Sequence, residues 1–193
     1  MKKILLLIVV FLSIFTLSGC KKDVEKTTVL MTVKDYGEIT IELDPTYAPK
    51  TVENFISLVD MGFYNGLSFH RIIDGFMIQG GDPLRDGTGG SGNNIKGEFS
   101  NNGVTNKLSH TRGVISMARN LYSNDSASSQ FFIVQEDSPH LDGDYATFGK
   151  VINGIEIVDA IAKGTKVEDE NGTVLRDNQP IIESIKIISA TEE

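Results

Sequence analysis

Two kinds of apolar pattern follow one another along the chain, and the more frequent of them predicts β-structure. Residues 29–34 and 38–43 are β-rich runs joined by Asp35-Tyr36-Gly37, which predicts a hairpin. Further short β-like runs lie at 67–73, 76–79, 114–118, 130–134, 146–151 and 180–189. Glycine-rich turns separate several of these runs, as is typical of an antiparallel sheet.

Two other segments carry a helical period. Over about 49–61, apolar residues recur at i, i+3, i+4 and i+7, which predicts a helix with one apolar stripe. A second helix is expected over about 154–163, with Asn153 as its N-cap and Glu156 three residues later. The expected fold is therefore mainly β, a closed antiparallel eight-stranded barrel covered by two α-helices.

The first 19 residues have the pattern of a secretory signal. Two lysines precede an apolar run at 4–17, which at 14 residues is shorter than a membrane-spanning helix. The run ends in Leu17-Ser18-Gly19-Cys20, which resembles the lipobox of bacterial lipoproteins. This resemblance implies cleavage before Cys20 and lipidation of that residue, and several acyl chains would make the anchor stable. The alternative is an ordinary cleaved signal followed by a chance cysteine.

The rest of the sequence indicates a single domain. We expect a signal peptide at 1–19, the lipidated cysteine and a polar tether at 20–28, and a single domain at 29–190. Cys20 is the only cysteine, so no internal disulfide can form. The formal net charge of −8 argues against a nucleic-acid partner, because nucleic-acid binders normally present a clustered basic face.

The residues that carry chemistry fall in an ordered set of short motifs. These are FHRIIDGFMIQGGD at 69–82, GTGG at 87–90, SMAR at 116–119, SQFFI at 129–133, LDG at 141–143 and FGKV at 148–151. In these motifs the chain resembles the cyclophilin family of peptidyl-prolyl cis-trans isomerases, from about Val29 to Ile188. The resemblance implies an isomerase that needs no cofactor, no metal and no covalent intermediate.

The chemistry of that reaction indicates which residue type is needed. An Xaa-Pro bond isomerises slowly because its C–N bond has partial double-bond character, with a barrier of roughly 18–20 kcal/mol. A catalyst needs an apolar pocket for the proline ring and a preorganised donor that favours the twisted amide. Arg71 is the expected donor, because its guanidinium is a permanently charged, rigid fork of N–H groups. The resemblance places it beside the prolyl nitrogen and carbonyl.

The resemblance implies the other site positions as well. As catalytic residues it gives Arg71, Phe76, Gln79 and Tyr145, and as substrate-binding residues Met77, Ala118, Arg119, Gln130, Phe132, Leu141 and His140. Strand alternation places Met77 and Gln79 on one face of their strand. In the same way it places Gln130 and Phe132 on one face of theirs. The same alternation sends Phe131 to the opposite face, where we expect it to be core packing.

Three of these positions depart from the best-known members of the family. His140 stands where those carry tryptophan, Tyr145 where they carry histidine, and Arg119 where they carry asparagine. Tyr145 keeps an aromatic wall and a hydroxyl group, so activity is expected to survive. The family's tryptophan is a contact of cyclosporin, so we expect weak cyclosporin binding by this chain.

Other patterns indicate no further chemistry. The G-x-G-x-x-G letters at 87–92 neither follow a strand nor open a helix, so we interpret them as a loop beside the groove. The three histidines, His70, His110 and His140, have no second ligand at metal spacing and are expected to be structural or surface residues. Ser91 and Ser116 lie in no nucleophile-elbow pattern.

The sequence is consistent with two functions. The first is a prolyl isomerase that assists the folding of exported proteins, lipid-anchored outside the cytoplasmic membrane and expected to be a monomer. Its partners would be proline-containing unfolded or flexible polypeptides. The second is a peptide-binding surface lipoprotein or adhesin with little turnover. Arg71 favours the enzyme, because a non-catalytic member would be expected to lose this side chain.

Overall fold

The computed structural model describes residues 25–188, so the expected signal peptide and Cys20 lie outside the described residues. β1 (Thr27–Val33) begins inside the expected tether and pairs with β2 (Gly37–Leu43) as the predicted hairpin. Asp35 and Gly37 in the turn have positive φ angles of 65° and 127°. Glycine reaches such angles without steric cost, which explains its place at the end of the turn.

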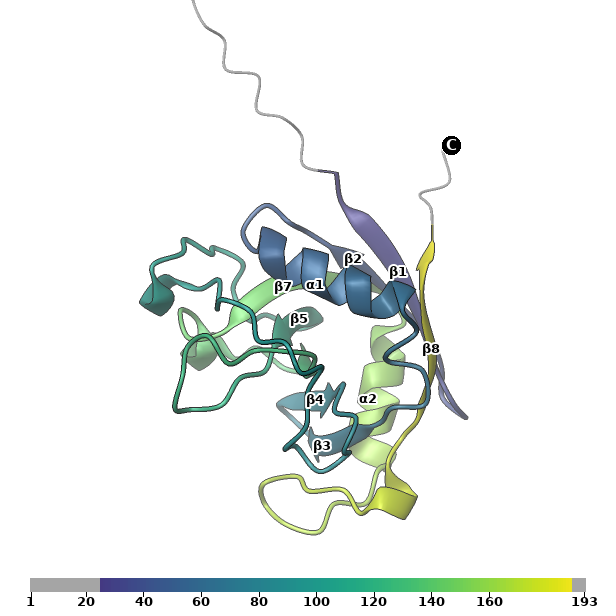
Figure 1. Cartoon of the computed structure of the whole chain (residues 1–193). Helices are drawn as coiled ribbons and strands as arrows, with labels where there is room; N and C mark the ends of the chain where they lie inside the picture. The colour runs from purple at the N-terminus through teal and green to yellow at the C-terminus, as the bar shows by residue number, and fades with distance from the viewer. Residues whose placement is uncertain (1–24, 189–193) are drawn as a thin grey trace, which may run out of the picture.

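The remaining elements follow the predicted order, with ends that differ by one or two residues for most of them (Figure 1). The strands are β3 (Phe69–Ile73), β4 (Met77–Gly80), β5 (Val114–Met117), β6 (Phe131–Val134), β7 (Ala146–Asn153) and β8 (Ile182–Ile188). The helices are α1 (Pro49–Asp60) and α2 (Ile155–Gly164), with short 3-10 turns η1 (Ser100–Asn102), η2 (Pro139–Leu141) and η3 (Arg176–Asn178).

The eight strands form one curled antiparallel sheet in the order β3-β4-β6-β5-β7-β2-β1-β8. The prediction of a closed barrel is wrong, because the edge strands β3 and β8 share no ladder. An isolated bridge between Ser68 and Ile181 links the residues just before the two strands. Beside it, the Phe69 N–H donates to the Pro180 carbonyl at 3.0 Å and the Ile182 N–H to the Leu67 carbonyl at 2.8 Å. The free edge of β3 is occupied by residues 172–174 instead: Ile72 donates to the Gly172 carbonyl at 2.8 Å, and Val174 donates to the His70 carbonyl at 3.0 Å.

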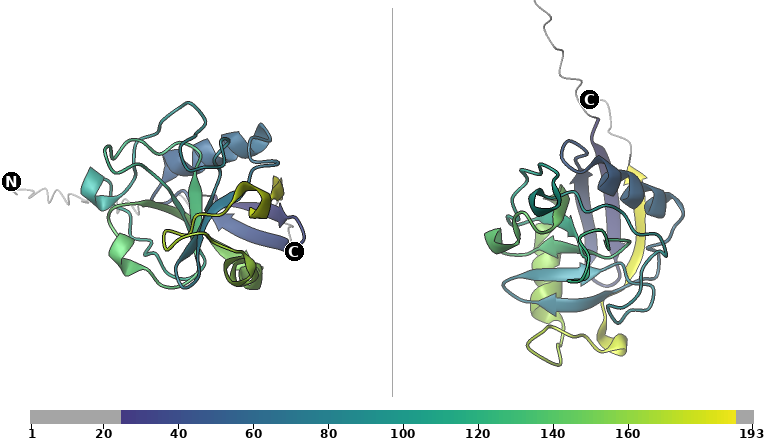
Figure 2. Two further views of the ribbon diagram at one scale, coloured as in Figure 1. Left: turned by 90° about the horizontal axis from the view of Figure 1, so that it is seen from below. Right: turned by 60° about the vertical axis from the view of Figure 1, so that its left-hand side comes forward.

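The two helices lie over opposite ends of the curled sheet (Figure 2), and both contribute buried residues to the main core. α1 packs against β7 and β8, while α2 packs against β2 and β4. The predicted N-cap of α2 is wrong: Gly154 occupies that position, with a φ of 86° and no side-chain capping hydrogen bond. A Cβ on Gly154 would lie 2.3 Å from the Glu38 carbonyl oxygen, so the close approach of α2 to β2 requires glycine.

Within residues 25–188, no helix has the length and apolar character needed to cross a bilayer. The main core fills the inside of the curled sheet and includes Phe55, Tyr64, Phe69, Phe131 and Phe148, all fully buried. Phe55 contacts the rings of Tyr64, Phe131 and Phe148 at centroid distances of 5.0–5.6 Å. Phe69 and Phe131 therefore belong to the core, which confirms the expectation for Phe131.

Candidate active site

A second apolar cluster lies on the outer face of the sheet, opposite the main core. Strand alternation on β6 sends Phe131 and Ile133 to the core and Phe132 and Val134 to this second cluster. β4 contributes Met77 to the same side. β6 is buried on both faces, which explains its continuous apolar sequence. We call this outer side of β4 and β6 the groove face.

An apolar cavity of about 210 Å³ opens on the groove face. Nine of the eleven expected site residues line it, namely Arg71, Phe76, Met77, Gln79, Ala118, Arg119, Phe132, Leu141 and Tyr145. These residues come from β3, β4 and β6 and from the segments after β5 and before β7, so only folding brings them together. Two guanidinium groups, those of Arg71 and Arg119, lie in the lining of this cavity.

Arg71 is held in place by groups behind it. Its Nε donates to the Asn171 carbonyl at 2.8 Å, and its Nη1 donates to Gln79 Oε1 at 3.3 Å and contacts Met77 Sδ at 3.9 Å. Burial lowers the pKa of the guanidinium, while Tyr145 and Asp169 act in the opposite direction. Arginine nevertheless stays charged in proteins, so the cavity has a fixed positive donor at its edge.

A chain of amide hydrogen bonds continues from Arg71 across the groove face. Gln79 Nε2 donates to Gln130 Oε1 at 2.9 Å, and Gln130 Nε2 donates to the carbonyls of Gly87 and Gly89 at 2.9 and 2.8 Å. Each amide is thereby oriented by its neighbour, because both of its ends have a partner. Arg71, Gln79 and Gln130 thus form one preorganised polar row.

The loop that ends this row is shaped by a buried carboxylate. Asp82 is fully buried and accepts hydrogen bonds from the backbone N–H groups of Leu84, Asp86 and Gly87 at 2.6–3.0 Å. A Cβ at Gly89 would lie 2.2 Å from Asp82 Oδ1, so this close approach requires glycine. The interpretation of 87–92 as a loop beside the groove is confirmed.

Tyr145 forms an aromatic wall together with Phe132. The two rings meet edge to face at 5.8 Å, and the Arg119 guanidinium lies 5.0 Å from the Tyr145 centroid. Arg119 is itself fixed by the Asp144 carbonyl at 2.8 Å and lies 5.4 Å from the Phe99 ring. A cation placed over two rings stabilises their position, so Arg119 supports the wall that Tyr145 provides.

Two expected site residues do not line this cavity, and one unexpected residue does. His140 is exposed in η2 and packs on Phe76 at 5.6 Å. Gln130 lies next to the cavity, in the polar row. Leu121 lines the cavity although 82% of it is exposed. Its signal in the sequence is a leucine within an Asn- and Ser-rich loop, which apolar periodicity does not detect.

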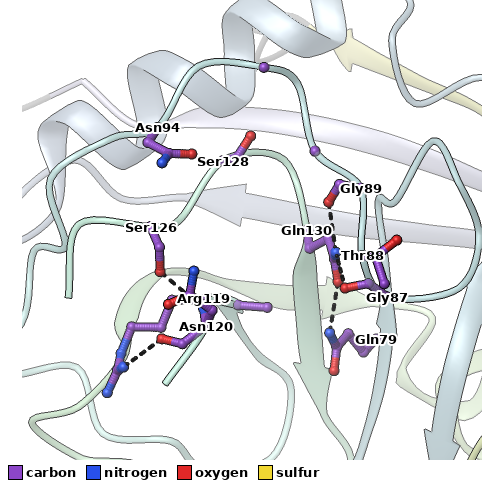
Figure 3. A pocket seen from close by; sticks show the side chains of 13 residues that line it. Gln79, Gly87, Thr88, Gly89, Asn94, Arg119, Asn120, Ser126, Ser128 and Gln130 are labelled. Carbon is purple, nitrogen blue, oxygen red and sulfur yellow. Dashed lines mark hydrogen bonds between the residues drawn. The ribbon is translucent and has the colours of Figure 1, made fainter. Parts of the chain in front are cut away.

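A second, more polar pocket of about 390 Å³ lies beside the apolar cavity (Figure 3). It shares Gln79, Ala118 and Arg119 with that cavity and is also lined by Asn94, Asn120, Ser126, Ser128 and Gln130. Figure 3 shows the amides of Gln79 and Gln130 on one side and Arg119 and Asn120 on the other. An extended chain on the groove face can therefore place one residue in the apolar cavity and a neighbour in this pocket.

His110 lies behind the aromatic wall in an arrangement that sequence spacing did not reveal. Its Nδ1 donates to Asp142 Oδ1 at 2.8 Å, and its Nε2 accepts from the Ser116 hydroxyl at 3.0 Å. This order of groups is that of a hydrolytic triad, but Ser116 is fully buried on β5 and lines neither the apolar cavity nor the polar pocket. His110 stacks on Phe132 with a 10° interplanar angle, so its role is to support the wall.

The two buried histidines predict a pH dependence of stability. Burial lowers the pKa of both His70 and His110, against the opposing effect of nearby carboxylates. The unfolded chain therefore binds protons at a higher pH than the folded chain, near 6.5. The contribution of these two histidines to the free energy of unfolding should be complete above this pH. It should decrease as the pH drops towards their lower pKa in the folded state.

Denaturant unfolding at pH 7.5 and pH 5.5 measures this loss. His110→Gln should show a smaller loss between the two pH values than the wild type, because one titrating group is removed. His140→Gln removes an exposed imidazole whose charge also lowers the pKa of His110, so it should reduce the loss by less than His110→Gln does. Equal losses in the wild type and His110→Gln would contradict the prediction.

Comparison with known proteins assigns this site to a family. Residues 28–192 match the family described as cyclophilin type peptidyl-prolyl cis-trans isomerase/CLD. A peptidyl-prolyl cis-trans isomerase of Helicobacter pylori is 43% identical over 150 residues, which cover 77% of this chain and 88% of that protein. Peptidyl-prolyl cis-trans isomerase B of Bacillus subtilis is 44% identical over 137 residues, covering 71% of this chain and 92% of that protein.

Solved structures agree with this assignment. The crystal structure of a Cryptosporidium parvum cyclophilin type peptidyl-prolyl cis-trans isomerase has a TM-score of 0.75 at 32% identity, covering 86% of this chain and 99% of that chain. A crystal structure of the same protein in the presence of the dipeptide Ala-Pro has a TM-score of 0.73 at 33% identity, covering 84% and 99% of the two chains.

Fold and sequence together define an isomerase of the EC 5.2.1.8 type, one that acts on peptidyl-prolyl bonds. The chain belongs to the cyclophilin-type peptidyl-prolyl cis-trans isomerase family.

Proposed function

We propose that this isomerase accelerates Xaa-Pro isomerisation in exported polypeptides, outside the cytoplasmic membrane and anchored there through Cys20. The observation that carries the reaction is the 210 Å³ apolar cavity with the Arg71 fork at its edge. Uncatalysed proline steps take tens to hundreds of seconds, so a chain that emerges from a membrane gains from a catalyst held at the same surface.

The roles of the groove residues follow from this chemistry. The proline ring enters the cavity between Phe76, Met77, Phe132 and Leu141, where apolar contacts hold it while the preceding residue rotates. Arg71 donates towards the prolyl nitrogen, which regains its lone pair as the amide twists out of planarity. Gln79 keeps that fork oriented through its hydrogen bond to Nη1. The Cryptosporidium parvum structure with Ala-Pro supports binding of a proline dipeptide by this family.

The remaining groove residues extend the site to neighbouring substrate residues. Gln130, Ala118 and Arg119 lie between the apolar cavity and the polar pocket and are placed to contact the backbone before or after the proline. Tyr145 supplies an aromatic wall and a hydroxyl group. His140 offers an exposed imidazole where a larger ring would cover more of a ligand, which supports the expectation of weak cyclosporin binding.

The location rests on the sequence of the first 28 residues. The apolar run at 4–17 followed by Leu17-Ser18-Gly19-Cys20 supports export and lipidation. Two or more acyl chains give stable membrane attachment, while the domain itself folds separately from the lipid. Such a tethered monomer would meet flexible polypeptides as they leave the membrane.

Expression of the full-length chain in a bacterial host tests this location. The wild type should incorporate labelled palmitate and sediment with membranes. Cys20→Ala should lose the label, while Ser18→Ala, which keeps a small residue before the Gly19-Cys20 pair, should behave like the wild type. An unlabelled wild-type protein in the soluble fraction would refute the lipid anchor, and isomerase activity measured on the same fractions would remain a separate result.

A further inference from the structure

A third cavity, of about 640 Å³, has Arg71 in its lining and shares Gln79 and Gly87 with the polar pocket. It shares Arg71 and Gln79 with the apolar cavity, so the two cavities adjoin at these side chains. We call it the arginine cavity, because Arg71, Arg85 and Arg176 all line it. Nothing in the proposed reaction uses this space.

The charge of the arginine cavity is opposite to that of the chain. The whole sequence has a formal net charge of −8, yet this cavity is lined by three arginines and by one carboxylate, Asp86. Asp86 is already engaged, since its Oδ1 accepts from the backbone N–H and the hydroxyl of Thr88. Outside the lining, Asp169 binds the backbone N–H and hydroxyl of Thr173, and Asp177 lies in η3 close enough to act on the pKa of Arg85.

Arg85 and Arg176 are each held by hydrogen bonds and still have N–H donors to offer. Arg85 Nε donates to Ser68 and Gln179, and its Nη2 donates to the Arg176 carbonyl at 3.2 Å. Arg176 Nη2 donates to the Leu84 carbonyl at 2.6 Å. Within residues 25–188, Arg85 Nη1 and the Nε and Nη1 of Arg176 have no hydrogen-bond partner. Preorganised guanidinium groups of this kind favour carboxylate ligands.

His70 supplies an independent indication of a ligand. Its side chain is only 5% exposed, it lines the arginine cavity, and neither ring nitrogen has a hydrogen-bond partner among the described residues. Gly87, which has a φ of 90°, covers the ring without a side chain: a Cβ there would lie 3.6 Å from His70 Nε2. Buried polar groups are nearly always paired, so an unpaired imidazole in a cationic cavity calls for an acceptor.

We propose that the arginine cavity binds the carboxylate of an aspartate or glutamate side chain in the same polypeptide whose proline occupies the apolar cavity. The inference rests on the proposed reaction and adds a substrate preference to it. Because the two cavities meet at Arg71 and Gln79, the acidic residue lies within a few residues of the proline, on one side of it only. Binding energy from this contact would hold the polypeptide in register on the groove face.

Three peptides that differ by single side chains test the proposal. One has a central Ala-Pro with glutamine two residues before and two residues after the proline, and the other two each replace one glutamine by glutamate. For the wild type, one of the two acidic peptides should have a kcat/KM about three- to tenfold above that of the neutral peptide at low salt. Arg176→Gln should reduce this ratio to about one.

Two further variants complete the design. Arg176→Lys should retain part of the preference, because it keeps the charge. Lys186→Gln removes an exposed positive charge on β8 that does not line the cavity, and should leave all three rates unchanged. Since each ratio is measured within one protein, a partly folded variant does not distort it. Equal rates for all three peptides, or a ratio that Arg176→Gln leaves unchanged, would overturn the proposal. Failure of the wild type to accelerate even the neutral peptide would overturn the reaction itself.

Discussion

Replacing Arg71 by alanine is expected to lower kcat/KM for an Xaa-Pro peptide by about two to three orders of magnitude, which corresponds to roughly 2.7–4 kcal/mol of lost transition-state stabilisation. The guanidinium is the one charged donor whose position is fixed beside the apolar cavity by both a backbone carbonyl and Gln79. Its contribution should appear mainly in the twisted state of the amide, because a planar prolyl nitrogen is a poor acceptor.

A protease-coupled or NMR exchange assay measures this effect on protein that begins at residue 21. Arg71→Lys is the matched control, since it keeps the charge but loses the planar fork, and we expect it to remain well below the wild type. Thermal unfolding of the variants separates catalysis from stability. Retention of activity within tenfold by a folded Arg71→Ala would show that the donor lies elsewhere in the groove.

Phe131→Ala is expected to cost about 3–5 kcal/mol in the free energy of unfolding, more than any substitution on the groove face. Phe131 is fully buried and meets the rings of Phe55, Tyr64 and Phe69 at centroid distances of 5.5–6.2 Å. Its removal leaves a cavity in the middle of the main core, where the surrounding rings are held by one another and cannot collapse freely.

Phe132→Ala is the matched comparison, because the two residues are adjacent on β6 and point to opposite faces. Phe132 packs in the smaller outer cluster and lines the apolar cavity, so its loss should lower kcat/KM strongly at a smaller cost in stability. Denaturant unfolding and the peptide assay, run on both variants, give the two readouts. Equal losses of stability with equal losses of activity would contradict the division between a structural and a catalytic face.

Local patterns in the sequence predicted the elements well. The period-2 alternation at 130–134 placed Phe131 and Phe132 on opposite faces, and the turn residues Asp35-Tyr36-Gly37 predicted the first hairpin. Both predictions depend only on neighbours within a few residues. The cap of α2 was missed because tertiary contact decided it: the approach of Gly154 to the Glu38 carbonyl leaves no room for a side chain.

Features that depend on distant segments could not be read from the sequence. The barrel was expected to close, yet the edge of β3 is bonded to residues 172–174, about a hundred positions further along the chain. His110 reaches Asp142 across 32 positions, and Arg71 reaches Asn171 across 100. Which residues gather in the groove was expected from family resemblance rather than from spacing. The residue that resemblance left out, Leu121, lies in an exposed loop whose position has no periodic signal.

The covered edge of β3 also bears on solubility. An unpaired strand edge offers a row of free N–H and C=O groups on which another chain can add and begin aggregation. Here the Gly172 carbonyl and the Val174 N–H are hydrogen-bonded to the backbone of β3. The other terminal strand, β8, carries exposed charges at Glu183 and Lys186. Flexible, partly folded polypeptides are the molecules most ready to add a strand to a free edge. Under the proposed function, the covered edge would let the protein bind such a polypeptide without adding it to its own sheet.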